Sequence, residues 1–178
     1  MNKDIENAIR CYIRAKDDNK PHLMSCVFSE HATLEMEVRT GAIDFPSATQ
    51  GRDEITKTLV RDFNKTYENI YTFCLNDTVI EKENTLDCQW FVVMSEKLSG
   101  SIRVGYGNYK WRFSNDNSYF VDKLTIVIED VMILSSSEEG QILSWVSSLP
   151  YPCLPSSDVL NSMPGIHSLT EWPRKWSD

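Results

Sequence analysis

Apolar residues in the first 66 positions recur with a helical period that is interrupted once by a strand-like alternation. Residues 5, 8, 9, 12 and 13 share one stripe, which predicts an amphipathic helix that ends in the polar run at residues 17–20. Pro21 suits the first turn of a second, shorter helix that reaches residue 28. Residues 32–38 alternate between apolar and polar side chains, as in a half-buried strand. After a loop at residues 40–50, a third helix begins near Gly51.

Residues 68–134 carry a strand pattern instead. Stretches rich in β-branched and aromatic residues predict strands at residues 70–75, 78–82, 86–96, 101–113 and 119–134, with short turns between them. Three helices followed by long antiparallel strands indicate an α+β fold rather than alternating βαβ units.

The C-terminal part differs again, because five of the seven prolines lie between residues 150 and 173. A helix is predicted just before them, at residues 138–148. We therefore divide the chain into a domain at residues 1–136 and a C-terminal helix and tail at residues 137–178. The tail carries Tyr151, Trp172 and Trp176, and rings of this size predict packing on the domain or on a partner subunit.

Composition and charge argue against several classes of function. With 18 Lys and Arg against 26 Asp and Glu, the net charge of −8 disfavours a nucleic-acid partner and an anionic membrane surface. No apolar run approaches the roughly 20 residues that span a bilayer, and the charged N-terminus is unlike a signal peptide. The five cysteines are scattered without a C-x-x-C pair, and the three histidines are equally dispersed. We expect a cytoplasmic protein without a metal site.

Three short motifs resemble the nuclear transport factor 2-like superfamily, in particular its SnoaL-like branch and the ketosteroid isomerases. Residues 12–19 (YIRAKDDN) look like the end of the family's first helix with its acidic turn. Residues 27–35 (VFSEHATLE) look like its step from helix to strand, with His31 where an Asp is usual. Residues 51–55 (GRDEI) match the start of its third helix, and the whole resemblance spans residues 3–134.

The resemblance implies a cone-shaped barrel, in which a strongly curved mixed or antiparallel sheet wraps around three N-terminal helices and leaves a pocket at its wide end. Family members use this pocket as isomerases, dehydratases, cyclases and hydrolases or as plain binding sites, so the fold does not fix the function. Many are dimers through the outer face of the sheet. For this chain the resemblance predicts a homodimer, a small apolar ligand and no external cofactor.

The resemblance also nominates residues for the pocket. Tyr12 falls where the isomerases keep a tyrosine that donates its O–H to a developing enolate oxygen, and Tyr109 falls on their second acid. Met36 stands where they keep the base, so ketosteroid isomerase activity is disfavoured. The predicted substrate-binding residues are Met36, Tyr71, Phe73 and Trp111.

Asp130 is the predicted general acid or base. It shares one face of the last strand with Ile126 and Ile128, and a carboxylate on an apolar face should have a raised pKa, which suits proton transfer. SnoaL-like cyclases are similar in keeping a catalytic Asp near the end of that strand. A single bulge would reverse the register and present Glu129 instead. The structural alternative is an Asp that only caps the strand or pairs with an Arg.

We therefore expect a pocket that binds a small apolar molecule, in which Asp130 and the tyrosines act as a cofactor-independent isomerase, cyclase or lyase (dehydratase) by acid/base chemistry. The alternative is a non-enzymatic ligand-binding or dimerisation module. An open cavity of about 300 Å³ or more would favour the enzyme. A cavity filled by side chains would favour the module.

Overall fold

The computed structural model describes residues 2–116 and 118–170, and it opens with the predicted amphipathic helix. This helix, α1 (Lys3–Asp17), starts where the Asn2 side chain accepts a hydrogen bond from the Asp4 backbone N–H. Acidic residues in its first turn and basic residues in its last turn complement the helix dipole. A 3-10 helix, η1 (Pro21–Cys26), follows, so the second helix is shorter than predicted.

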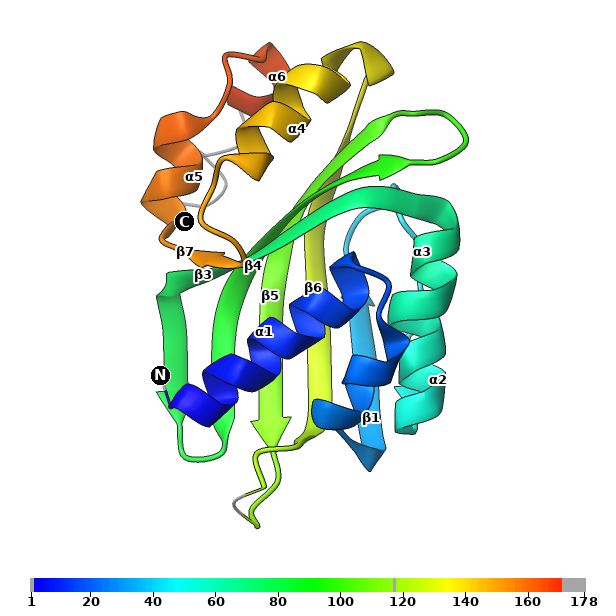
Figure 1. Cartoon of the computed structure of the whole chain (residues 1–178), viewed down its shortest axis with the longest axis vertical. Helices are drawn as coiled ribbons and strands as arrows, with labels where there is room; N and C mark the ends of the chain where they lie inside the picture. Colours follow the sequence, from blue (N-terminus) through cyan, green and yellow to red (C-terminus); the bar gives the residue numbers. More distant parts are fainter. Residues whose placement is uncertain (1, 117, 171–178) are drawn as a thin grey trace.

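The strands form one mixed sheet in the order β2-β1-β6-β5-β4-β3-β7 (Figure 1). They are β1 (Phe28–Val38), β2 (Ala48–Gln50), β3 (Tyr67–Lys82), β4 (Thr85–Glu96), β5 (Ile102–Phe113), β6 (Val121–Leu134) and β7 (Cys153–Leu154). The β1–β6 and β3–β7 pairs are parallel, and the other pairs are antiparallel. With seven strands and six α-helices in the described part of the chain, the α+β class is confirmed. The sheet ends at β2 and β7 and does not close, which corrects the predicted barrel.

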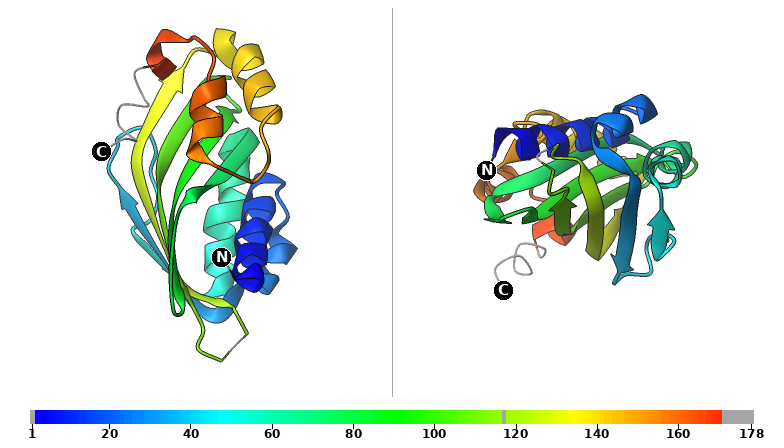
Figure 2. Two further views of the ribbon diagram at one scale, coloured as in Figure 1. Left: turned by 90° about the vertical axis from the view of Figure 1, so that its left-hand side faces the viewer. Right: turned by 90° about the horizontal axis from the view of Figure 1, so that it is seen from below.

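The predicted third helix is one continuous helical segment with a π-helical middle. It consists of α2 (Arg52–Thr56), η2 (Lys57–Asp62) and α3 (Phe63–Thr66). The strands bend, and this segment and α1 lie on the same side of them (Figure 2). Such π-helical turns are rare and occur often at functional sites.

Two strand boundaries differ from the prediction. The stretches at residues 70–75 and 78–82 belong to the single strand β3, whose pairing with β4 is irregular between Leu75 and Ile80. The expected turn at Asn76 is therefore a local irregularity within a strand. The short strand β2 lies in the segment predicted as a loop.

Two hydrophobic cores lie on opposite faces of the sheet. Trp90 and Met94 of β4 belong to the core under α1, whereas Phe91 and Val93 belong to the core under the C-terminal helices. These helices are α4 (Glu139–Ser147), which follows the 3-10 turn η3 (Ser136–Glu138), α5 (Ser156–Ser162) and α6 (His167–Thr170). They gather at the upper end of the sheet in Figure 1. The C-terminal part is thus more regular than predicted, and Trp172 and Trp176 lie outside the described residues.

Candidate functional site

A small cavity lies between α1, the helical segment at residues 52–66 and one face of the sheet. Its volume is about 50 Å³, and its wall is mostly apolar, with Met36, Leu59, Phe63 and Ile128 among the contributors. A buried water needs roughly 10–15 Å³ of such volume, so the cavity has room for a compact ligand. It is well below the roughly 300 Å³ at which drug-sized pockets begin.

Five polar side chains reach this cavity, and two of them carry hydrogen-bond donors without a well-formed hydrogen bond. The polar residues are Tyr12, Lys16, Thr72, Trp90 and Tyr109. Tyr12 is fully buried, and its hydroxyl lies next to that of Tyr109 without forming a hydrogen bond of good geometry. The Trp90 indole N–H has no hydrogen-bond partner among the described residues. Both side chains contribute to the cavity wall, while the two donor atoms themselves are buried within that wall.

Tyr109 completes the aromatic side of the cavity. Its ring contacts the Tyr12 ring edge-on, with 5.9 Å between the centroids, and lies 5.7 Å from the Trp90 ring. Burial raises the pKa of both the Tyr12 and the Tyr109 hydroxyl well above the ordinary value. Both hydroxyls therefore stay protonated to a higher pH than an exposed tyrosine does. The predicted residue Trp111 packs behind Tyr12 at 5.2 Å and does not line the cavity.

A buried ion pair borders the cavity. Lys16 is 6% exposed, and its Nζ donates to Asp17 Oδ1 at 2.7 Å and to Thr72 Oγ1 at 2.6 Å. Asp17 also accepts from the Thr72 backbone N–H at 2.6 Å, from the Thr72 hydroxyl at 2.8 Å and from the Tyr151 hydroxyl at 3.1 Å. The Asp17 carboxylate thus accepts three hydrogen bonds from neutral donors besides the one from the Lys16 ammonium. Thr72 contacts both members of the ion pair and links them.

This network was not predicted from the sequence, although one signal for it was present. Lys16 follows Tyr12 by four residues, so both lie on the same face of α1. A lysine on an apolar stripe must either reach solvent or find a buried partner. No comparable pattern connects Tyr151 to α1, because it comes from the C-terminal segment.

Comparisons with known proteins agree with this architecture. No family model matches the chain, and no curated protein matches it. Among solved structures, a nuclear transport factor 2-like protein from Burkholderia xenovorans superposes with a TM-score of 0.56 at 9% identity, covering 72% of this chain and 91% of that one. A Catenulispora acidiphila protein with a ketosteroid isomerase-like fold, in complex with trimethylamine, gives 0.54 at 11% identity over 67% and 82%. The chain has the nuclear transport factor 2-like fold.

The same fold occurs in an enzyme. An LEH-like epoxide hydrolase from M. tuberculosis superposes with a TM-score of 0.53 at 5% identity, covering 71% of this chain and 83% of that one. Identities this low show the fold and leave the activity open.

Within this nuclear transport factor 2-like sheet, a bulge in β6 keeps both candidate carboxylates out of the cavity wall. Tyr106 pairs with Asp130 and Gly107 pairs with Ile128, so Glu129 is an extra residue. Ile128 and then Val131 therefore face the cavity, and Asp130 is turned away from it. The Asp130 carboxylate accepts from the Val131 backbone N–H at 2.9 Å.

Glu129 is held on the outside of the sheet. Its two carboxylate oxygens lie 2.8 and 2.9 Å from an Arg39 guanidinium nitrogen, and Asn108 donates to it at 3.3 Å. The structure therefore does not bring either carboxylate to Tyr12 and Tyr109, contrary to the sequence-based expectation.

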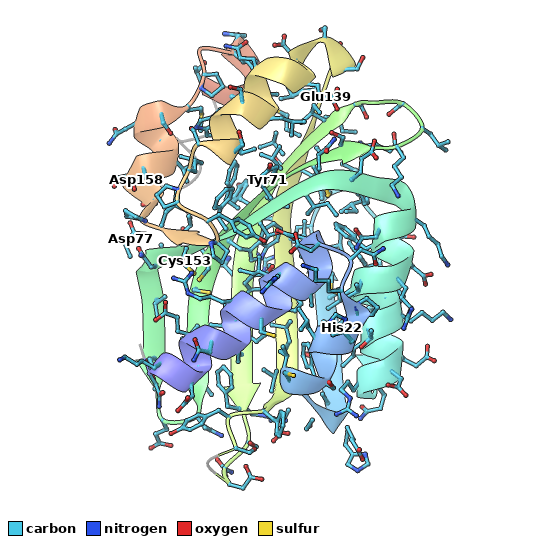
Figure 3. The ribbon with its side chains drawn as sticks, in the orientation of Figure 1. His22, Tyr71, Asp77, Glu139, Cys153 and Asp158 are labelled. Carbon is cyan, nitrogen blue, oxygen red and sulfur yellow. The ribbon has the colours of Figure 1, made fainter. Side chains whose placement is uncertain are left out.

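Tyr71 and Phe73 also face away from the cavity. Their neighbour Thr72 points toward Lys16, and alternation along β3 turns them to the core beneath the C-terminal helices. The Tyr71 ring lies 6.3 Å from that of Tyr151, below the C-terminal segment (Figure 3). Of the predicted substrate-binding residues, Met36 is the one that the structure places in the cavity wall.

Two features are absent from the described residues. No helix is long and apolar enough to cross a membrane. No group of three or more His, Cys, Asp or Glu side chains is placed to hold a metal ion in the same part of the chain.

Proposed function

We propose that the cavity binds a small apolar molecule through an acceptor oxygen, and that the chain belongs to the SnoaL-like branch of its fold. The observation that carries this proposal is that two side chains in the wall of one apolar cavity, Tyr12 and Trp90, each hold a buried donor without a well-formed hydrogen bond. A buried donor without a partner costs about 1–3 kcal/mol. Such groups are expected where a ligand supplies the partner.

The chemistry that fits these donors acts on a carbonyl compound. Donors that hold a carbonyl oxygen hold an enolate oxygen more strongly, because negative charge develops on that atom in the transition state. We therefore propose isomerisation, cyclisation or dehydration without an external cofactor. The LEH-like neighbour, which is an epoxide hydrolase, supports catalysis on this fold, and the neighbour bound to trimethylamine supports a ligand of small size.

A non-enzymatic ligand-binding or dimerisation module is the second candidate, and the cavity volume of about 50 Å³ favours it. A curved, cone-like sheet, a homodimer and a cytoplasmic location belong to the same proposal. The family resemblance supports the first two, and the charged N-terminus and the scattered cysteines support the third. Light scattering on the purified chain tests the dimer.

The experiment that tests the proposal compares three single variants. Wild type, Tyr12→Phe, Trp90→Phe and Trp111→Phe are titrated calorimetrically with compact ketones such as 2-butanone and cyclopentanone. Trp111→Phe is the matched control, because its buried indole N–H is also unpartnered but does not line the cavity. Tyr12→Phe and Trp90→Phe should each bind about tenfold more weakly, which corresponds to about 1.4 kcal/mol, whereas Trp111→Phe should bind like wild type.

Tyr12→Phe has a second expected effect, because it removes a buried hydroxyl without a well-formed hydrogen bond. The ligand-free variant should therefore be at least as stable as wild type in urea denaturation. Ketones that bind neither to wild type nor to any variant would contradict the proposal, as would equal affinity of wild type and Tyr12→Phe.

A further inference from the structure

Lys16 is the one charged side chain in the described wall of the cavity. Its Nζ can donate three hydrogen bonds, and two of them go to Asp17 and Thr72. The Phe63 ring, whose centroid is 5.0 Å from Nζ, also lines the cavity. The amine therefore lies at the border between the polar network and the space proposed for a ligand.

We propose that Lys16 is a nucleophilic amine that forms an imine with a small aldehyde or ketone in the cavity, with Asp17 as its proton acceptor. The inference rests on the proposed function, because it requires that the cavity admits a carbonyl compound. It names a covalent step, a nucleophile and a substrate class for that site.

The step begins with a proton transfer within the ion pair. The Lys16 ammonium passes one proton to Asp17, across the 2.7 Å between Nζ and Oδ1, and becomes a neutral amine. The nitrogen lone pair attacks the carbonyl carbon, and a proton moves from nitrogen to oxygen to give a carbinolamine. Protonated Asp17 then returns its proton to the hydroxyl group, which leaves as water. The products are a protonated imine on Lys16, the Asp17 carboxylate and one water molecule, so atoms and charge balance.

The surrounding groups suit each part of this step. Thr72 and Tyr151 donate to Asp17 and hold its carboxylate beside Nζ while the charge on the lysine changes. Tyr12, one helical turn before Lys16, supplies an O–H without a well-formed hydrogen bond, and this group can donate to the carbonyl oxygen as negative charge develops there. The mostly apolar wall disfavours water beside the imine, which slows its hydrolysis.

Reductive trapping tests the proposal on the intact chain. Wild type is incubated with 2-butanone or butanal and sodium cyanoborohydride, and the modified lysines are identified by peptide mass spectrometry. Lys65, whose side chain is 74% exposed, is the internal reference for an ordinary surface amine. We expect the reduced adduct to form on Lys16 at least tenfold faster than on Lys65.

Two variants separate the proton acceptor from a purely structural effect. Asp17→Asn keeps a hydrogen-bonding side chain but cannot accept the proton, and it should reduce the labelling rate of Lys16 to that of Lys65 or below. Tyr151→Phe removes only the outermost hydrogen bond of the network from a residue that is 41% exposed, so it should fold normally. It should slow labelling of Lys16 severalfold without changing labelling of Lys65.

The outcomes distinguish this inference from the function on which it rests. Calorimetric binding of 2-butanone to wild type, with an adduct on Lys16 no faster than on Lys65, overturns the amine chemistry and leaves the binding function standing. Neither binding nor a selective adduct overturns both. An unchanged rate on Lys16 in folded Asp17→Asn overturns the assignment of Asp17 as proton acceptor.

Discussion

Replacing one partner of the buried Lys16–Asp17 pair should destabilise the fold strongly. Lys16→Met keeps most of the aliphatic chain but removes the ammonium. The Asp17 carboxylate, whose side chain is 2% exposed, is then buried without a cation beside it. Breaking a buried ion pair typically costs 3–5 kcal/mol. Three donors from Thr72 and Tyr151 still reach the carboxylate, so we expect about 3 kcal/mol for Lys16→Met.

Asp17→Asn should lower the free energy of unfolding more than Lys16→Met does. The double variant should lower it by less than the sum of the two single effects. Without the carboxylate, the Lys16 ammonium keeps the Thr72 hydroxyl as its described acceptor, so we expect about 4 kcal/mol. In Lys16→Met/Asp17→Asn no charge remains buried, and the total should be about 4 kcal/mol rather than about 7, a coupling of about 3 kcal/mol.

Urea denaturation followed by tryptophan fluorescence measures these free energies of unfolding, with circular dichroism to confirm that each variant is folded. Lys65 and Asp62 provide a matched control, because their Nζ–Oδ1 distance is also 2.7 Å but both side chains are exposed. Lys65→Met and Asp62→Asn should produce no measurable coupling. Additive effects at Lys16 and Asp17, or single effects as small as those of the control pair, would refute the view that this network is a buried, coupled unit.

Three further predictions concern the sheet, the tyrosines and the C-terminal part. Gly107→Ala should destabilise the chain by about 4 kcal/mol or more in urea denaturation, because the new Cβ would lie 1.9 Å from the Val127 carbonyl oxygen; Gly140→Ala, with no atom within 4 Å, should change stability little. Since the pKa of Tyr12 is raised by burial, the folded chain keeps a proton that the unfolded chain loses above about pH 10, so stability is full below that pH and falls as pH rises further. Tyr12→Phe should make that fall shallower in pH-dependent urea titrations, and an identical slope would contradict the burial argument. Deleting residues 150–178 removes Leu154, Val159 and Leu169 from the second core, so the melting temperature should drop or the oligomeric state should change. If both stay as in wild type, this part of the chain does not stabilise the sheet.

The sequence was sufficient for the elements with a clear period and for part of the cavity. The stripe of α1 placed Tyr12 correctly beneath the sheet, and the alternation of β1 placed Met36 on the same side. The sequence was insufficient where a bulge decides which face of the sheet a side chain lies on. The extra residue at Glu129 exchanges the two faces of β6, and its position depends on the backbone approach at Gly107, which no period in the sequence reveals.

The wrong assignment of Tyr71 and Phe73 has a different cause, and it changes how the C-terminal part is understood. The run from Cys88 to Met94 is apolar at nearly every position, which is typical of a strand that is buried on both faces. The outward face of such a strand needs a cover, and α4, α5 and α6 supply it. Because the segment that joins α4 to α5 also brings the Tyr151 hydroxyl to Asp17, the C-terminal part both covers the sheet and completes the polar network beside the cavity. Its contribution to stability and its contribution to the proposed chemistry should therefore be separable, the first by changes in the second core and the second by Tyr151→Phe.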